Sequence, residues 1–172
     1  KDKKPYDFLR NRIIFPIYDV IGNVIAFGGR TLEKDIQPLY INTPDTSVYS
    51  KSRSLYGLFQ GKNAIAKTKK AIILEGYIDV LICHQNGFEN AVAPLGTAIT
   101  SDQIRILSRS AEELIFVFDS DESGKNAALR AAEMCLEQGI NSRICSLPEG
   151  IDPDEYILRY GKEKFNYLID SG

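Results

Sequence analysis

Two short apolar runs, each followed at once by acidic residues, limit most strongly what this chain can fold into. They span residues 71–74 and 114–118. Short runs that are rich in β-branched and aromatic residues and stop at glycine or turn residues are typical of buried parallel strands. The sequence therefore predicts two central strands of an α/β sheet, with acidic residues at their C-terminal ends.

Four carboxylates stand at these predicted strand ends. Glu75 and Asp79 follow the first run, and Asp119 and Asp121 follow the second. In an open α/β sheet this edge binds ligands at the point where the strand order reverses. Ionised carboxylates gathered at one place repel one another unless a cation joins them. Because oxygen ligands without His or Cys favour Mg²⁺ or Mn²⁺, the sequence predicts a divalent-metal site here.

The second half of the chain alternates strand and helix patterns. Strands are predicted over residues 71–74, 90–95, 114–118 and 141–147, and helices over 78–85, from Thr100 onward, over 125–138 and over 154–169 with a bend near Gly161. The order βαβαβαβα predicts a doubly wound parallel sheet. In the common strand order 2-1-3-4 the first and third strands are neighbours, which would bring Glu75 close to Asp119.

The first half of the chain is basic, whereas the second half is acidic. Residues 1–70 hold 13 Lys and Arg against 6 Asp and Glu, and residues 71–172 hold 8 against 17. This segregation predicts that one half binds polyanions and that the other binds metal ions. Chance segregation of solvated surface charge is the alternative interpretation.

Residues 12–32 are predicted to form a β-hairpin around the Gly-Asn pair at residues 22–23. Pro16 in the first strand predicts an edge position or a bulge. The glycines at residues 28–29 are predicted to end the second strand and to allow close approach to a ligand. Arg30, which follows them, is either a phosphate contact or an ordinary surface residue.

Residues 34–54 are predicted to form a loop in which basic and aromatic residues alternate. Lys51 and Arg53 lie there with Tyr40 and Tyr49. Basic side chains beside aromatic ones suit a nucleic-acid backbone with exposed bases. A polar surface loop would have a similar composition, so both interpretations stay open.

Each acidic residue also has a purely structural interpretation. Asp79 could be a first-turn residue stabilised by the helix dipole, and Asp121 could cap the helix that follows it. Asp152 stands before Pro153 and three residues before Glu155, which is the pattern of a helix N-cap with a capping box. Acidic groups after three of the four predicted strands together favour one common site.

Other chemistries have little support in the sequence. His84 is the only histidine and falls within a predicted helix, which favours a hydrogen-bonded structural imidazole. Cys83, Cys135 and Cys145 lack metal-ligand spacing, so we expect no zinc site and predict buried, reduced thiols in a cytoplasmic protein. No apolar run approaches the ~18 residues of a membrane span. Because Lys1 is not an initiating methionine, we expect the chain to be a fragment.

Several segments match the motifs of a known family in residue type and spacing. Residues 75–80, 119–124 and 152–154 resemble the Toprim motifs, and more narrowly those of bacterial DnaG-type DNA primases. Residues 12–16, 27–30, 40–44 and 51–58 resemble the polymerase core of that family. The resemblance covers nearly the whole chain.

The resemblance implies a fold and a role for each group of residues. It implies a Toprim-like domain over residues 71–155, preceded by a basic, partly β subdomain over 1–70 and followed by the start of a helical segment over 156–172. The implied metal site consists of Glu75, Asp79, Asp119, Asp121, Asp152 and Asp154, of which the first four would also be catalytic. The implied nucleotide or nucleic-acid contacts are Arg12, Arg30, Lys51 and Arg53. Leu39 departs from the family pattern, which often has Lys before the residue that matches Tyr40.

The resemblance also implies an activity, which is the synthesis of short RNA primers on single-stranded DNA. Ribonucleoside triphosphates and Mg²⁺ or Mn²⁺ would be required, an RNA–DNA hybrid would form, and a replicative helicase would bind regions outside this chain. Two alternatives stay open. The chain could be part of a Toprim nuclease or topoisomerase, or a non-catalytic Toprim DNA-binding module whose carboxylates bind no metal.

Overall fold

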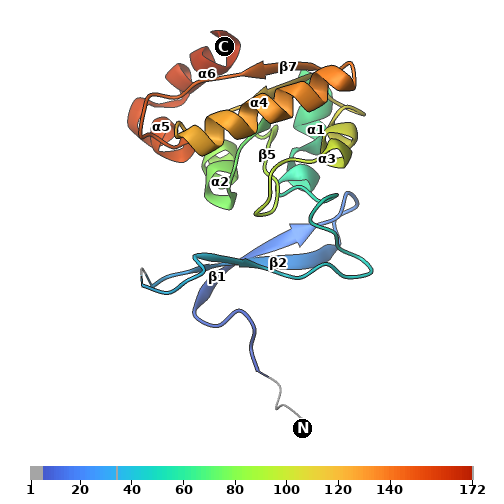
Figure 1. Ribbon diagram of the computed structural model, residues 1–172, viewed down its shortest axis with the longest axis vertical. Helices are drawn as coiled ribbons and strands as arrows, with labels where there is room; N and C mark the ends of the chain where they lie inside the picture. Colours follow the sequence, from blue (N-terminus) through green and yellow to red (C-terminus); the bar gives the residue numbers. More distant parts are fainter. Residues whose placement is uncertain (1–5, 34, 172) are drawn as a thin grey trace.

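The computed structural model describes residues 6–33 and 35–171 and contains two sheets (Figure 1). Residues 1–5, 34 and 172 lie outside the described residues. The first two groups belong to the expected subdomain over residues 1–70, and residue 172 belongs to the expected helical segment over 156–172. A three-stranded sheet has the order β1-β2-β3, and a four-stranded sheet has the order β5-β4-β6-β7. In Figure 1 the first sheet lies beside a larger body of helices packed on the second sheet.

The predicted hairpin is confirmed, although its second strand is longer than expected. Strand β1 spans Arg12–Tyr18 and pairs in an antiparallel direction with β2, Val24–Thr31. The Asp19 carboxylate closes the turn by accepting backbone N–H groups from the next turn residues. The prediction that residues 28–29 end the second strand is wrong, because both pair with β1 and with β3, Tyr40–Asn42.

The larger sheet has the predicted parallel topology. Its strands are β4 (Lys70–Ile73), β5 (Ala91–Val92), β6 (Glu113–Phe116) and β7 (Asn141–Ile144). The order β5-β4-β6-β7 is the predicted order 2-1-3-4. Since Ile73 pairs with Phe116, the chain leaves β4 and β6 at the same edge, where Glu75 and Asp119 follow.

Helices cover both faces of this sheet. They are α1 (Leu58–Thr68), α2 (Tyr77–Gln85), α3 (Ser101–Leu107), α4 (Glu122–Glu137), α5 (Pro153–Tyr160) and α6 (Lys162–Ser171). One apolar cluster joins alternate strand residues to α2, α5 and α6, and a second joins the others to α1, α3 and α4. The sheet is therefore doubly wound, as predicted. The predicted capping box of Thr100 with Gln103 and the break at Gly161 are also confirmed.

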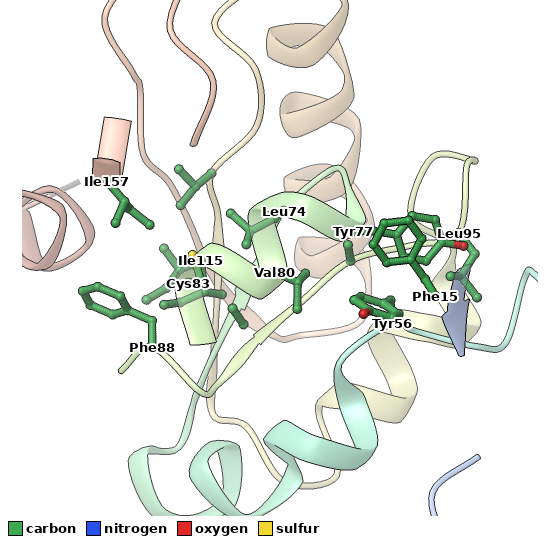
Figure 2. Packing of buried hydrophobic residues seen from close by; sticks show 14 of the residues in the cluster. Phe15, Tyr56, Leu74, Tyr77, Val80, Cys83, Phe88, Leu95, Ile115 and Ile157 are labelled. Carbon is green, nitrogen blue, oxygen red and sulfur yellow. The ribbon is translucent and has the colours of Figure 1, made fainter. Parts of the chain in front are cut away.

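An aromatic cluster joins the small sheet to the parallel sheet (Figure 2). The ring of Tyr77 stacks on Phe15 with centroids 4.7 Å apart and meets Tyr56 edge-on at 4.7 Å. Its hydroxyl donates to Asn42 Oδ1 at 2.6 Å. A Cβ atom on Gly28 would overlap the Tyr77 ring. The close approach that we expected of this glycine is therefore made to a protein side chain.

The Tyr77 hydroxyl is expected to contribute measurably to stability. Tyr77→Phe keeps the stacked ring but leaves the side-chain carbonyl of the half-buried Asn42 without its donor, which should cost about 1 kcal/mol. Thermal and urea unfolding would measure the loss. Tyr167→Phe, at a position that is 74% exposed, is the matched control and should unfold like the wild type. Equal stability of all three proteins would contradict this role.

Candidate active site

The C-terminal edge of the parallel sheet borders a cavity of about 390 Å³. Five of the six acidic residues predicted for the metal site line it: Glu75, Asp79, Asp119, Asp152 and Asp154. The small sheet and the segment before β3 contribute Arg30, Leu39 and Tyr40 to the wall. The cavity thus joins the acidic half of the chain to the basic half.

Glu75 is held by the backbone of the neighbouring strand end. Its Oε1 atom accepts the Asp119 N–H at 2.9 Å. Only glycine fits at Gly124, because a Cβ atom there would lie 2.9 Å from the same oxygen and overlap the Asp119 carbonyl. Burial raises the pKa of Glu75, the Asp119 N–H lowers it, and the charges of neighbouring aspartates raise it further. Glu75 is therefore a fixed carboxylate that binds a proton or a cation more readily than an exposed one.

Asp79 links the starts of two helices. One oxygen accepts the Gly76 N–H at 3.0 Å at the start of α2, and the other accepts the Asp154 N–H at 3.3 Å in α5. Burial, followed by the charges of Asp154 and Asp119, raises its pKa to about 7. The predicted position of Asp79 in the first turn of α2 is thus confirmed, whereas its stabilisation by the helix dipole stays a prediction, and the residue also lines the cavity.

Asp119 and Asp121 differ although they are two residues apart. Burial and the charges of Glu75 and Asp152 raise the pKa of Asp119 to about 7. Asp121 caps α4, since its Oδ1 atom accepts the Gly124 N–H at 2.7 Å. Its charge still raises the pKa of Glu75. The capping interpretation of Asp121 is therefore confirmed, and its assignment as a metal ligand stays a prediction.

Asp152 occupies the N-cap position of α5 without acting as a cap. Pro153 follows at the first helical position, but within the described residues the Asp152 side chain makes no capping hydrogen bond. The predicted capping interpretation is wrong for this side chain. Burial and the charges of Asp154 and Glu155 raise the pKa of Asp152. Its carboxylate thus stays available to a ligand in the cavity.

The residues of this cavity fit divalent cations of the magnesium type. Among residues 6–33 and 35–171, no group of three or more His, Cys, Asp or Glu side chains is arranged to hold one ion. Mg²⁺ commonly retains several waters and binds through one or two carboxylates together with substrate phosphates. An all-oxygen donor set spread along one wall therefore suits ions that each bind one or two carboxylates.

Arg30 is the predicted basic residue that the structure brings to the carboxylates. It lines their cavity, and its guanidinium carbon lies 5.9 Å from the centre of the Tyr40 ring. Its Nε atom is buried and has no hydrogen-bond partner among the described residues. A buried donor without a partner is costly, so a bound acceptor such as a phosphate oxygen would satisfy it.

The other predicted basic residues lie elsewhere. Arg12 donates to the backbone carbonyls of Gly29, Pro38 and Leu39 at 2.9–3.1 Å, so it ties β2 to the segment before β3. Lys51 and Arg53 lie on the loop that precedes Leu55, and Arg53 is exposed. Their contacts with nucleic acid stay predictions.

Sequence reasoning did not identify Tyr40 and Leu39 as parts of the cavity wall. The strand of Tyr40 is only three residues long, and no pattern in it points to the acidic residues. The structural interpretation of His84 is confirmed, because its Nε2 atom lies 2.8 Å from the Ala91 carbonyl oxygen. The three cysteines are free and buried, as predicted. No helix among the described residues is long and apolar enough to cross a membrane.

The fold and the acidic edge define a Toprim-like domain, which is an α/β domain with carboxylates at the ends of parallel strands. The family described as Toprim-like matches residues 72–157, and the N-terminal domain of the DNA primase catalytic core matches residues 1–62. The chain belongs to the Toprim-like family and corresponds to part of the catalytic core of the DnaG-type DNA primases.

The chain is similar to DNA primases of several bacteria. The chain is 43% identical over 164 residues to the DNA primase of Halalkalibacterium halodurans, and the alignment covers 95% of this chain and 27% of that protein. It is 45% identical over 172 residues to the DNA primase of Clostridium acetobutylicum, and that alignment covers 99% of this chain and 28% of that protein. The chain thus spans little more than a quarter of the length of these relatives.

Solved primase structures share the fold. The zinc-binding and RNA polymerase domains of Aquifex aeolicus primase match with a TM-score of 0.92 at 41% identity, over 96% of this chain and 41% of that one. A DnaG catalytic domain bound to single-stranded DNA matches with a TM-score of 0.89 at 40% identity, over 96% and 53%. The Mycobacterium tuberculosis RNA polymerase domain in complex with double-stranded DNA matches with a TM-score of 0.83 at 36% identity, over 92% and 52%. These matches favour the primase interpretation over the topoisomerase, nuclease and non-catalytic alternatives.

The raised pKa of Asp119 predicts a stabilising substitution in metal-free buffer. Its pKa is about 7 in the folded state against an ordinary value of 3.8. The folded state therefore holds this proton more tightly, and its stability falls as the pH rises from about 4 to about 7. At mildly alkaline pH with a chelator, Asp119→Asn should be more stable than the wild type by about 1–2 kcal/mol, after allowance for solvent screening of a half-buried charge. Thermal unfolding would measure the difference.

Added Mg²⁺ should reduce or reverse this difference. A cation that binds only the folded wild type raises its melting temperature, and the variant should gain less. Asp102→Asn on α3, which removes an exposed partner of Arg105, is the matched control and should respond to Mg²⁺ like the wild type. If the wild type and Asp119→Asn gain equally from Mg²⁺, Asp119 is not a ligand.

Proposed function

We propose that this chain is the part of a primase polymerase core that joins ribonucleotides into short RNA primers on single-stranded DNA. The observation that carries the proposal is the single cavity lined by five carboxylates and by Arg30, whose buried Nε is free among the described residues. Carboxylates that bind cations, beside a fixed cationic donor, suit the phosphates of a ribonucleoside triphosphate. The DNA primases among its relatives support the same function.

The proposed reaction is nucleotidyl transfer. The primer 3′-hydroxyl oxygen forms a bond to the α-phosphorus of the incoming nucleotide, and the bond from that phosphorus to the bridging oxygen of the β-phosphate breaks. Pyrophosphate leaves with the electron pair, and the hydroxyl proton passes to a base. Bound Mg²⁺ or Mn²⁺ would activate the hydroxyl and neutralise the charge of the leaving group.

The residues of the chain would position and neutralise these groups. Asp119, Asp152 and Asp154 would hold the cations, and Asp79 would fix α2 against α5 around them. Glu75 would act either as a cation ligand or as the proton acceptor, because burial raises its pKa toward the range in which a general base works. Arg30 would donate to a phosphate oxygen of the nucleotide.

The basic half would hold the template and the RNA–DNA hybrid. Lys51 and Arg53 would contact phosphates without reading the base sequence. Arg12 would also contact a phosphate, through the guanidinium N–H groups that do not donate to its three backbone carbonyls. Solved relatives bound to single-stranded and double-stranded DNA support DNA as a partner. Binding of a replicative helicase through other regions of the parent protein, and a cytoplasmic location, belong to the same proposal.

Primer synthesis by the full-length parent protein tests this function. The assay supplies single-stranded DNA, ribonucleoside triphosphates and Mg²⁺, and it compares the wild type with Glu75→Gln. The wild type should make short RNA, and the variant should lose at least about 100-fold in rate, because it keeps the shape of the side chain but loses its charge. Gel analysis of labelled RNA would measure the product.

Glu137→Gln, at an exposed position near the end of α4, is the matched control and should make RNA at the wild-type rate. A wild type that makes no RNA but nicks DNA when Mg²⁺ is present would assign the carboxylates to phosphodiester cleavage. That result would overturn the primase proposal in favour of the nuclease alternative.

A further inference from the structure

Gln103 is a fully buried polar side chain whose amide is completely hydrogen bonded. It lies in α3 and is 0% exposed. Its Oε1 atom accepts the Thr100 N–H at 3.0 Å, and its Nε2 atom donates to the carbonyls of Lys51 at 2.9 Å and Ser54 at 2.7 Å. Both N–H donors of the amide are therefore directed at one distant loop.

Thr100 makes a third bond between the start of α3 and this loop. Its Oγ1 atom accepts the Gln103 N–H at 3.2 Å and donates to the Ser52 carbonyl at 2.6 Å. Three carbonyls of residues 51–54 thus accept bonds from two side chains of the Toprim-like domain. We call residues 51–54 the basic loop, since they include Lys51 and Arg53.

The rest of the basic loop is also fixed through its backbone. Asp45 accepts the Lys51 N–H at 3.0 Å and the Ser50 hydroxyl at 3.2 Å. The loop is flanked by two anchors, Tyr49 at 1% and Leu55 at 2% exposure. Its backbone is therefore held on several sides, whereas Lys51 is only half-buried and the Arg53 side chain is exposed.

The cap of α3 alone would not require this arrangement. Capping α3 uses only the Oε1 atom of Gln103, so the helix cap does not need the two bonds from Nε2. A buried amide is favourable only when its donors are satisfied, and here the basic loop satisfies both. The two bonds from Nε2 thus serve the position of the loop.

We propose that Gln103 is a positioning residue for nucleic-acid binding. It fixes the basic loop so that Lys51 and Arg53 present their charges together to the phosphodiester backbone of single-stranded DNA. Fixing the loop before binding lowers the ordering cost that two flexible cationic side chains would otherwise impose. This inference rests on the proposed contacts of Lys51 and Arg53 with nucleic acid.

The test measures binding of a labelled single-stranded oligonucleotide by the whole chain at several salt concentrations. The slope of log affinity against log salt falls by about 0.7 for each phosphate of a single strand that the protein no longer neutralises. Lys51→Ala with Arg53→Ala should lower the slope by about 1.4. Gln103→Met keeps the length of the side chain but removes both donors and the acceptor of the Thr100 N–H. It should weaken binding and lower the slope by about 0.7–1.4.

In the Lys51→Ala, Arg53→Ala background, adding Gln103→Met should leave the slope unchanged, because no charges remain to be positioned. Gln138→Met is the matched control, since it removes one side-chain bond to the Met134 carbonyl in α4, away from the basic loop. That variant should bind DNA like the wild type. Thermal unfolding of every variant separates loss of stability from loss of positioning.

Three other results of these measurements would overturn the inference. If Gln103→Met unfolds at a lower temperature but keeps the wild-type slope, Gln103 is structural only and the inference is overturned, while the contacts of Lys51 and Arg53 stand. If Lys51→Ala with Arg53→Ala keeps the slope, the proposed contacts fail and the inference fails with them. If Gln103→Met does not fold, Gln103→Asn keeps a polar amide but is one methylene shorter, which withdraws its donors from the Lys51 and Ser54 carbonyls. An unchanged slope in that variant overturns the inference.

Discussion

Repulsion among carboxylates at one edge of the parallel sheet is the constraint on which the rest of the structure depends. The cavity there is lined by five of them, and the pKa values of Asp79 and Asp119 are both about 7. Like charges stay this close only in a framework that cannot open to separate them. The strand ends that follow β4 and β6 supply that framework, because helices pack on both faces of the sheet. This accumulation of negative charge is the feature on which the proposed binding of divalent cations rests.

Backbone N–H groups orient these carboxylates without neutralising them. Glu75 accepts the Asp119 N–H, and Asp79 accepts two further backbone donors. Among the described residues, the ion pairs lie elsewhere: Lys70 and Arg143 pair with Glu113 at the start of β6, Lys70 with Asp170, and Arg105 with Asp102. The carboxylates at the cavity are therefore oriented by backbone N–H groups but are not neutralised by these ion pairs. Arg30 is the cationic side chain that lines the same cavity.

The sequence predicted the meeting of Glu75 and Asp119 because both depend on topology. Alternating strands and helices leave few strand orders, and all parallel strands end at the same edge. Strand lengths were harder to predict, since a strand extends only as far as its neighbours pair with it. Residues 90–95 thus contain only the two-residue strand β5. The role of Gly28 depends on Tyr77, which is far along the chain, and no local pattern reports that contact.

The role of an acidic residue at a helix start could not be predicted from the sequence. Asp121 and Asp152 both stand at N-cap positions, and local pattern alone favoured a cap more strongly for Asp152. In the structure only Asp121 caps its helix, through the Gly124 N–H. The difference lies in the N–H donors of the first turn. In α4 the Gly124 N–H donates to Asp121. In α5, by contrast, the Asp154 N–H donates to Asp79 and the Glu155 N–H donates to the Asp154 side chain, so neither caps through Asp152. Whether a carboxylate at a helix start serves the helix or a cation is thus decided by tertiary packing around the first turn.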